Sequence, residues 1–365
     1  MTDRQLIQNA LDEGIRSGVA TAVALCASRG ADEAIVWYSG HHRPNGEGEA
    51  CGPNSIFDLA SLTKPLTMGL HMLRLASTAE LDLRAPIGEY LTVKSERLSR
   101  VPVWRLLVHE SGLEAHREYF APYMERSLND FDFATTRREI ECRLSREQPF
   151  VAPQIIELYS DLGFMVLRAI SEAIGHDLRE GWSALPGHGP DALHFRALPA
   201  ANGDPKYVAT ENCLWRRRLL QGQVHDDNAW AMGGVCGHAG LFGTLQSVYS
   251  AAREWAKCRA GEPNDLGISH SVVTDAFIDG HLRRQGNRFL AWDRRTPGKS
   301  TSGQYFSAAS YGHLGFTGTS IWNDPVEDIT VVLLTNRVCP TRDNTGIRQF
   351  RPMVHDLVRT LLVGG

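Results

Sequence analysis

The chain contains very little lysine. Of its 38 basic residues only five are lysine, and the rest are arginine. Arginine cannot give up its proton in a protein, whereas a desolvated lysine can. Only one of the five lysines, Lys64, stands three residues after a serine, Ser61. This single S-x-x-K places a titratable amine one helical turn from a hydroxyl that it could activate.

Other absences exclude whole classes of protein. The chain has no long run of like charge, its formal net charge is −4, and its densest basic spot is Arg216–Arg218, so nucleic-acid binding is not indicated. The seven cysteines lack a C-x-x-C spacing, and the 14 histidines lack the H-x-x-x-H and H-E-x-x-H spacings. These patterns predict reduced, mostly buried thiols, no metal ion and no other cofactor.

The sequence also lacks a long apolar stretch. No segment approaches the roughly 18 apolar residues that cross a bilayer. Residues 1–17 form an amphipathic pattern without the apolar core of a signal peptide. We therefore expect a cytoplasmic location, or a periplasmic or secreted one if a leader has been removed. The oligomeric state is left open.

The order of predicted elements is strands, then helices, then strands. A helix over residues 1–17 precedes a hairpin at 19–28 and 34–38, and helical patterns with irregular connections fill 80–232. A helix at 246–259, strands at 288–292, 319–322 and 329–334, a turn at 323–325 and a helix at 347–362 complete the chain. This order predicts an α/β (α+β) fold, with an antiparallel sheet flanked by helices and an inserted all-α lobe. Residues 1–60 and 235–365 are expected in the α/β lobe and 61–234 in the helical one, with the active site in the groove between.

A nucleophilic Ser61 needs further groups around it. Pro65 is best tolerated in the first turn of a helix, so Ser61 is expected at or just before a helix start, where the macrodipole favours negative charge. No G-x-S-x-G occurs, which argues against an α/β-hydrolase triad. Among the nine tyrosines only Tyr159 is followed two residues later by Asn or Asp, here Asp161.

A histidine and a glycine near the C-terminal end of the sequence complete the set of candidate active-site residues. His313-Leu314-Gly315 stands just before the last predicted strand pair and offers a cation and a glycine that lets a substrate backbone approach. A second H-x-G, at 238–240, lies in a glycine-rich bend and is more typical of a turn. His109 is expected to hold a turn by hydrogen bonds, and the polar segment 224–228 fits either a cleft rim or a solvated loop.

In their order, S-x-x-K, Y-x-[ND] and [KH]-x-G resemble the serine β-lactamase and penicillin-binding-protein superfamily. The tyrosine box points to class C β-lactamases, D-Ala-D-Ala carboxypeptidases of similar fold and family VIII esterases. Residues 57–64, 106–113 and 159–164 also look familiar, and the resemblance spans roughly residues 5 to 362.

The resemblance implies a role for each matching residue. Ser61 attacks a carbonyl and becomes acylated. Lys64 and Tyr159 form the proton-transfer pair, and either could be the general base. The backbone N–H groups of Ser61 and Phe316 would form the oxyanion hole.

Two boxes depart from the family pattern. Asp161 replaces the usual Asn; it would orient Lys64 or the substrate amide, and its charge would raise the pKa of Lys64. His313 replaces the usual Lys, and Leu314 replaces the usual Thr before Gly315. His313 would help to bind a substrate carboxylate or tune Tyr159, but a histidine is only partly charged at neutral pH. These changes favour a neutral ester or amide.

The sequence therefore predicts a serine hydrolase acting on a small ester, amide or peptide. An esterase or amidase ranks first, a D-Ala-D-Ala carboxypeptidase second and a class C-type β-lactamase third. The non-enzyme alternative, a binding protein that keeps the fold without turnover, is opposed by the intact Ser61, Lys64 and Tyr159. Segments 119–123 and 281–292 are expected to supply pocket walls.

Overall fold

The computed structural model describes residues 2–149, 157–178, 193–277 and 288–364. Within them, the α-helices are α1 (Asp3–Arg16), α2 (Leu70–Ser77), α3 (Glu96–Ser99), α4 (Val103–Leu107), α5 (Phe133–Leu144), α6 (Asp161–Ala173), α8 (Asp227–Ala231), α9 (Leu245–Ala260), α10 (His270–Phe277) and α11 (Ile347–Val363). The strands are β1 (Ala22–Arg29), β2 (Ile35–Gly40), β3 (Phe57–Asp58), β4 (His194–Phe195), β5 (Asn212–Cys213), β6 (Arg218–Leu219), β7 (Leu241–Gly243), β8 (Arg288–Phe289), β9 (Trp292–Arg294), β10 (Tyr311–Leu314), β11 (Ser320–Asp324) and β12 (Ile329–Thr335).

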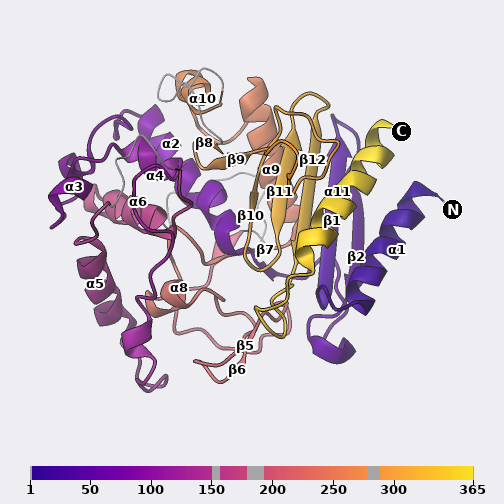
Figure 1. The fold of residues 1–365 in the computed structure, drawn as a ribbon, viewed down its shortest axis with the longest axis horizontal. Coiled ribbons are helices and arrows are strands. Elements are labelled where there is room, and N and C mark those ends of the chain that lie inside the picture. The colour runs from indigo at the N-terminus through magenta and orange to yellow at the C-terminus, as the bar shows by residue number, and fades with distance from the viewer. Residues whose placement is uncertain (1, 150–156, 179–192, 278–287, 365) are drawn as a thin grey trace.

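The main sheet combines both ends of the chain. In the described residues seven antiparallel strands run in the order β2-β1-β12-β11-β10-β9-β8, so β1 pairs with β12, and Val23 lies opposite Thr335. Two smaller sheets, β3-β7-β4 and β5-β6, lie elsewhere. Figure 1 shows most of the main sheet on one side of the molecule and α2 to α6 and α8 on the other, with α10 above β8 in this view. The predicted antiparallel sheet flanked by helices is confirmed, whereas the division into two lobes stays a prediction.

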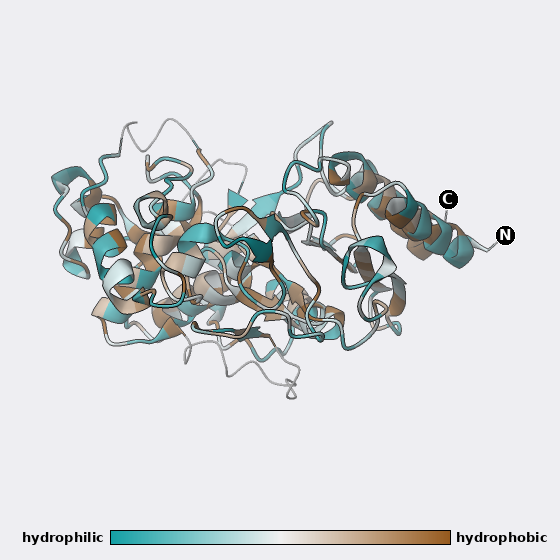
Figure 2. Ribbon diagram, turned by 90° about the horizontal axis from the view of Figure 1, so that it is seen from below, coloured by the Kyte–Doolittle hydropathy of each residue, from teal (hydrophilic) through white to brown (hydrophobic). Residues whose placement is uncertain are grey.

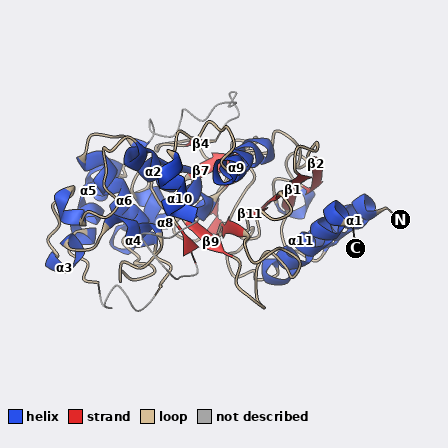
Figure 3. Cartoon of the chain, turned by 90° about the horizontal axis from the view of Figure 1, so that it is seen from above, coloured by secondary structure: helices blue, strands red, loops and turns tan. Residues whose placement is uncertain are grey.

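Both faces of the central strands β1, β12 and β11 are buried. Alternate residues of β1 enter two different cores: Ala22, Ala24 and Cys26 join the larger, and Val23, Leu25 and Ala27 join the smaller. Helix α9 covers the first face, and α1 and α11 pack together over the second (Figure 3). Figure 2 shows the polar and apolar sides of these terminal helices. Burial on both faces explains why β1 and β12 are largely apolar rather than alternating.

Two predicted elements were wrong in detail. The strand expected at 288–292 is two strands, β8 and β9, because the chain turns at Leu290–Ala291 and Ala291 adopts a φ of 65°. The turn expected at 323–325 lies at 325–328, because the strand β11 continues through Asp324. The short strands β4, β5 and β6 inside the helical stretch were not anticipated, since two-residue strands leave no periodic signal.

The hairpin and the long helices match the prediction closely. The strands β1 and β2 pair antiparallel, and α9 and α11 lie within one residue of their predicted bounds. All seven cysteines are unpaired, and five of them are buried. No helix in the described ranges is both long and apolar enough to cross a membrane.

Candidate active site

Ser61 and Lys64 face each other across one turn. Ser61 lies in the short 3₁₀ helix Ala60–Leu62, and a π-helical turn over Lys64–Gly69 leads on into α2. Lys64 Nζ donates a hydrogen bond to Ser61 Oγ at 2.9 Å, and the Lys64 side chain has no exposed surface. The spacing that singled out this pair thus corresponds to direct contact at the start of a helical segment, as the sequence predicted.

The backbone that enters Ser61 is held in an unusual conformation. Ala60 has a φ of 47°, a region that non-glycine residues rarely adopt. Its N–H donates to Asp58 Oδ1 at 2.8 Å, and Thr319 Oγ1 donates to the carbonyl of Leu59 at 3.1 Å. Thr319, directly before β11, and the Asp58 carboxylate of β3 therefore fix the backbone directly before the candidate nucleophile.

Gly315 is required by the chain's own packing. A Cβ placed there would collide with Thr319 Oγ1 and would lie 2.6 Å from the carbonyl oxygen of Leu59. The sequence-based expectation attributed this glycine to the approach of a substrate backbone. In the structure it is the backbone before Ser61 that occupies the space, so Gly315 brings the end of β10 against the nucleophile.

Three oxygen atoms surround the Lys64 ammonium. Besides Ser61 Oγ, its Nζ donates to Asp161 Oδ1 at 2.7 Å and to the carbonyl of His238 at 3.1 Å. Burial lowers the pKa of Lys64, but the Asp161 carboxylate and the nearby Tyr159 outweigh it, so the pKa is raised. The raised pKa and these oxygen acceptors favour a protonated lysine that donates to Ser61.

Asp161 is the first residue of α6, while Ser160 caps the helix by accepting from Gly163 N. Burial raises the pKa of Asp161, but the Lys64 ammonium and a bond from His116 hold it well below its usual range. His116 Nδ1 lies 3.3 Å from Asp161 Oδ2, and this bond is the main reason that the pKa of His116 is raised. No motif marked His116, because contacts across 45 residues leave no trace in local spacing.

Tyr159 lies among rings and cations. Its ring centroid is 4.9 Å from Lys64 Nζ, 4.4 Å from the His109 ring and 6.0 Å from the His313 ring. His109, at a φ of 59°, accepts a hydrogen bond from the backbone N–H of Ser160 at 2.9 Å, which matches the turn-holding role expected of it. The three boxes of the sequence motif thus meet around one tyrosine.

The surroundings of His313 disfavour the charged form that was expected. Burial, and then the charges of Lys64 and Arg288, lower the pKa of His313 well below its usual value. Its Nδ1 lies 2.9 Å from the carbonyl of Leu314, and its buried Nε2 has no hydrogen-bond partner among the described residues. A neutral ring next to Tyr159 is suited to influence that phenol and unsuited to bind a carboxylate.

A cleft of about 940 Å³ opens above these residues. Its lining includes Ser61, Tyr159, Asp161, His313, Leu314, Gly315 and Phe316. Lys64 is not part of this lining but contacts Ser61, which is. Every residue proposed from the sequence therefore lies in or directly beneath one cavity.

Segments with uncertain roles also reach the cleft. His225, Asp226 and Asp227 line it, so the 224–228 segment is a rim rather than a solvated loop. The second H-x-G lies there too, because Ala239 lines the cleft and His238 Nε2 lies 3.1 Å from Asp226 Oδ1. From the predicted wall at 119–123, Phe120 lines the cleft. Of the other predicted wall, residues 281–287 lie outside the described residues, and Asp293, just beyond it, lines the cleft.

The fold and this set of side chains define a serine hydrolase related to the β-lactamases. The chain belongs to the Beta-lactamase family, whose model matches residues 4–351. The predicted family and the predicted fold class are thereby confirmed, and so is the predicted class of function, a serine hydrolase of this family.

Known relatives carry several different activities in their names. The chain is 25% identical over 319 residues to the N-acetylmuramyl-L-alanine amidase of Bacillus subtilis (strain 168), covering 78% of this chain and 68% of that protein. It is 25% identical over 329 residues to a putative D-alanyl-D-alanine carboxypeptidase of Salmonella typhi, covering 78% and 70%. A class C β-lactamase structure superposes with a TM-score of 0.70 at 12% identity, covering 99% of this chain and 98% of that one, which shows the fold alone.

Proposed function

We propose that this protein hydrolyses a small ester or amide through a covalent acyl-Ser61 intermediate. The observation that carries the proposal is the 2.9 Å hydrogen bond from the buried Lys64 ammonium to Ser61 Oγ, at the floor of the cleft. A buried lysine held against a hydroxyl, and held in turn by Asp161, is the arrangement of an activated nucleophile with its orienting groups.

We assign the proton transfers from the charge state of Lys64. Because Asp161 keeps Lys64 protonated, the lysine is an electrostatic partner rather than the base. We then assign Tyr159, whose ring centroid lies 4.9 Å from Lys64 Nζ, as the group that takes the Ser61 proton when Oγ attacks the carbonyl carbon. The same proton passes to the leaving group as its bond to the acyl carbon breaks. Water then hydrolyses the ester on Ser61 by the reverse path.

The oxyanion is assigned to two backbone N–H groups, those of Ser61 and Phe316. Their separation depends on the contact between Gly315 and Leu59, and on Arg337 Nε, which donates to the carbonyl of Phe316 at 2.8 Å. Donors fixed before the reaction stabilise the developing negative charge without reorganising, which is the largest single effect in many acyl transfers.

Among substrates we rank an ester or amide with a small acyl group first. The amidase named among the relatives supports amide chemistry, and the relative named as a putative D-alanyl-D-alanine carboxypeptidase keeps that peptidase second. The neutral His313 and the apolar Leu314 weaken the case for a class C-type β-lactamase, which stays third. A cytoplasmic location also stays a prediction.

Intact-mass spectrometry, which detects acyl adducts, and an assay of p-nitrophenol release together test this proposal. The wild type, Ser61→Ala and a control, Ser250→Ala, are mixed with p-nitrophenyl butyrate and, separately, with a penicillin. Ser250 lies on α9 and does not line the cleft. We expect rapid release of p-nitrophenol by the wild type and the control, and loss of turnover by more than about 100-fold in Ser61→Ala.

Each other outcome changes the assignment. A long-lived penicilloyl adduct on Ser61 favours the peptidase, and rapid penicillin hydrolysis favours the β-lactamase. If neither reagent acylates the wild type, the catalytic proposal is wrong and the binding-protein alternative replaces it.

A further inference from the structure

Phe316 is an exposed aromatic residue inside the cleft. Its side chain is 51% exposed, and among the exposed large apolar residues in the described part of the chain it alone lines the cleft. The others, such as Tyr305, lie elsewhere on the surface. Single exposed apolar side chains are common on protein surfaces, so exposure alone assigns no role to Phe316. A role follows from how its ring is held and from what lies beside it.

Two buried side chains, His225 and Arg337, hold the Phe316 ring. The His225 ring stacks against it, with the centroids 5.7 Å apart and the planes inclined by 25°. The Arg337 guanidinium lies 4.3 Å from the centroid of the Phe316 ring. Stacking and a cation over an aromatic face both stabilise the ring in this position.

His225 and Arg337 are themselves fixed by hydrogen bonds. The His225 backbone N–H donates to Asp58 Oδ2 at 2.6 Å, and His225 Nε2 lies 2.9 Å from Glu211 Oε2. Arg337 donates to three backbone carbonyls, including that of Phe316 itself. The ring is therefore positioned before a substrate enters, and a contact with it does not carry the entropic cost of ordering a free side chain.

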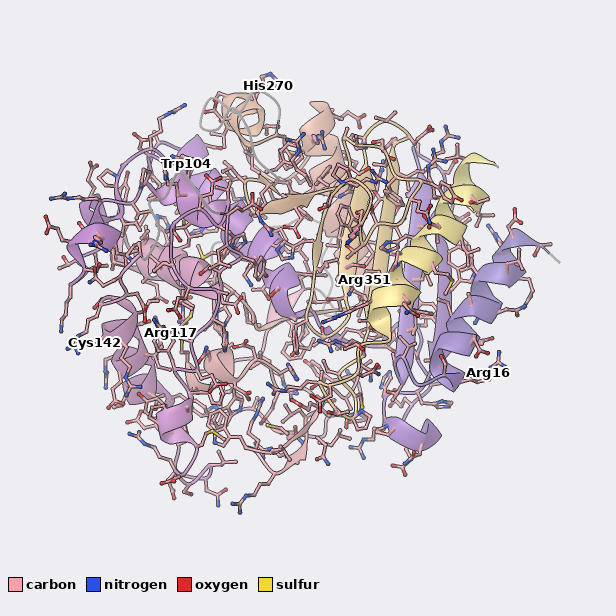
Figure 4. The ribbon with its side chains drawn as sticks, viewed as in Figure 1. Arg16, Trp104, Arg117, Cys142, His270 and Arg351 are labelled. Atoms are coloured by element: carbon pink, nitrogen blue, oxygen red, sulfur yellow. The ribbon has the colours of Figure 1, made fainter. Side chains whose placement is uncertain are left out.

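The Phe316 ring lies next to the proposed reaction centre. Its side chain branches from the Cα atom that is bonded to the N–H assigned to the oxyanion. Leu314 and Ile347 add apolar surface to the lining, and a cleft of about 940 Å³ is of the size that holds drug-sized ligands. Ile347 is the first residue of α11, and Figure 4 labels Arg351 one turn further along this helix. The cleft thus offers both an apolar surface and the space for a larger apolar group.

We propose that the Phe316 ring forms a subsite that binds an aromatic group of the substrate beside the bond that is cleaved. The inference rests on the proposed hydrolase function and names its substrate class as a neutral ester or amide that carries an aromatic ring. Contact between the two rings removes apolar surface of both from water. Offset or edge-to-face packing of the rings adds a further attraction.

Binding to a protein that cannot turn over separates this subsite from catalysis. In the Ser61→Ala protein, ligand-observed NMR titrations compare three neutral amides. The N-methyl amide of acetic acid has no ring, the N-methyl amide of phenylacetic acid has a ring on the acyl side, and the benzylamide of acetic acid has a ring on the leaving-group side. We expect at least one of the two amides with a ring to bind roughly 10- to 100-fold more tightly than the amide without one.

Variants in the Ser61→Ala background assign that preference to Phe316. Phe316→Ala should reduce the preference at least about fivefold, whereas Phe316→Leu should keep part of it, because leucine retains apolar surface but not the ring. The matched control is Tyr305→Ala, which removes an exposed aromatic ring outside the cleft and should leave the preference intact. If Phe316→Ala fails to fold, as judged by circular dichroism, Phe316→Gln replaces it and should show the same loss.

The proposal is overturned if the three amides bind equally, or if the preference for a ring survives the loss of the Phe316 ring. Failure of the proposed function looks different. It is a wild-type protein that releases no p-nitrophenol from p-nitrophenyl butyrate, whatever the Ser61→Ala protein binds. The two results are therefore independent.

Discussion

Replacing Asp161 by asparagine removes the carboxylate that faces Lys64 and leaves an oxygen able to accept its hydrogen bond. The two charged atoms are 2.7 Å apart, with side-chain exposures of 0% for Lys64 and 18% for Asp161. At an effective dielectric constant of 20, Coulomb's law gives about 6 kcal/mol for this attraction. Removing one partner of a buried pair costs about 3–5 kcal/mol. Because the amide keeps one hydrogen bond, we expect Asp161→Asn to lose about 3 kcal/mol of unfolding free energy.

The pH dependence of this loss follows from the two pKa shifts. The pKa of Asp161 is depressed, so its stabilisation is complete above its unfolded value near 3.9 and is lost as the pH falls toward the folded value. The pKa of Lys64 is raised, so its stabilisation is complete below its unfolded value near 10.4 and is lost as the pH rises through the folded value. The difference between wild type and variant should be constant from roughly pH 5 to 9 and narrow below about pH 4.

Urea unfolding followed by tryptophan fluorescence at pH 7 and pH 3 measures both effects. The control is Asp204→Asn. The Asp204 carboxylate pairs with Arg196 at 3.5 Å, and the side-chain exposures are 32% for Asp204 and 20% for Arg196. A partly exposed pair of this kind contributes less than about 1 kcal/mol. An Asp161→Asn protein within about 0.5 kcal/mol of the wild type at pH 7 would refute the argument that the carboxylate stabilises a charged Lys64.

Three further substitutions test other parts of the site. Gly315→Ala should cost about 3 kcal/mol in urea unfolding and abolish ester turnover, because its Cβ collides with Thr319, whereas Gly52→Ala, with only one atom 4.0 Å away, should change neither. Lys64→Met should slow acylation in stopped-flow assays by more than about 100-fold; a smaller loss removes the lysine from the mechanism. His116→Gln should destabilise more at pH 5.5 than at pH 9 in thermal melts, since a raised histidine pKa stabilises below its unfolded value; equal losses contradict this.

Short-range spacing accounts for what the sequence could predict about the site. A turn of helix brings residues three apart into contact, so S-x-x-K was sufficient to pair Ser61 with Lys64. Largely apolar runs likewise predicted β1 and β12, and amphipathic periodicity predicted α11. The boxes at Tyr159 and His313 were found through a family resemblance rather than from geometry.

What the sequence could not predict depends on three-dimensional packing. The charge of His313 depends on its burial and on the charges of Lys64 and Arg288, which no local pattern records. His116 and Arg351 reach the cleft from segments that lie far from the motifs along the chain. The turn that divides β8 from β9 needs a positive φ at Ala291, where a glycine would have signalled it and an alanine does not.

The pairing of β1 with β12 has a consequence for the synthesis of the protein on the ribosome. After the hairpin of β1 and β2 emerges, the other edge of β1 has no partner until β12 has been synthesised. Val23, for example, cannot pair with Thr335 before then. At about 5–20 residues per second, some 300 residues take roughly 15–60 seconds. During that interval an apolar strand with a free edge is open to pairing with other chains. Thr319, which donates to the carbonyl of Leu59, is also synthesised late in the chain. The nascent chain is therefore prone to aggregation well before its active site can form.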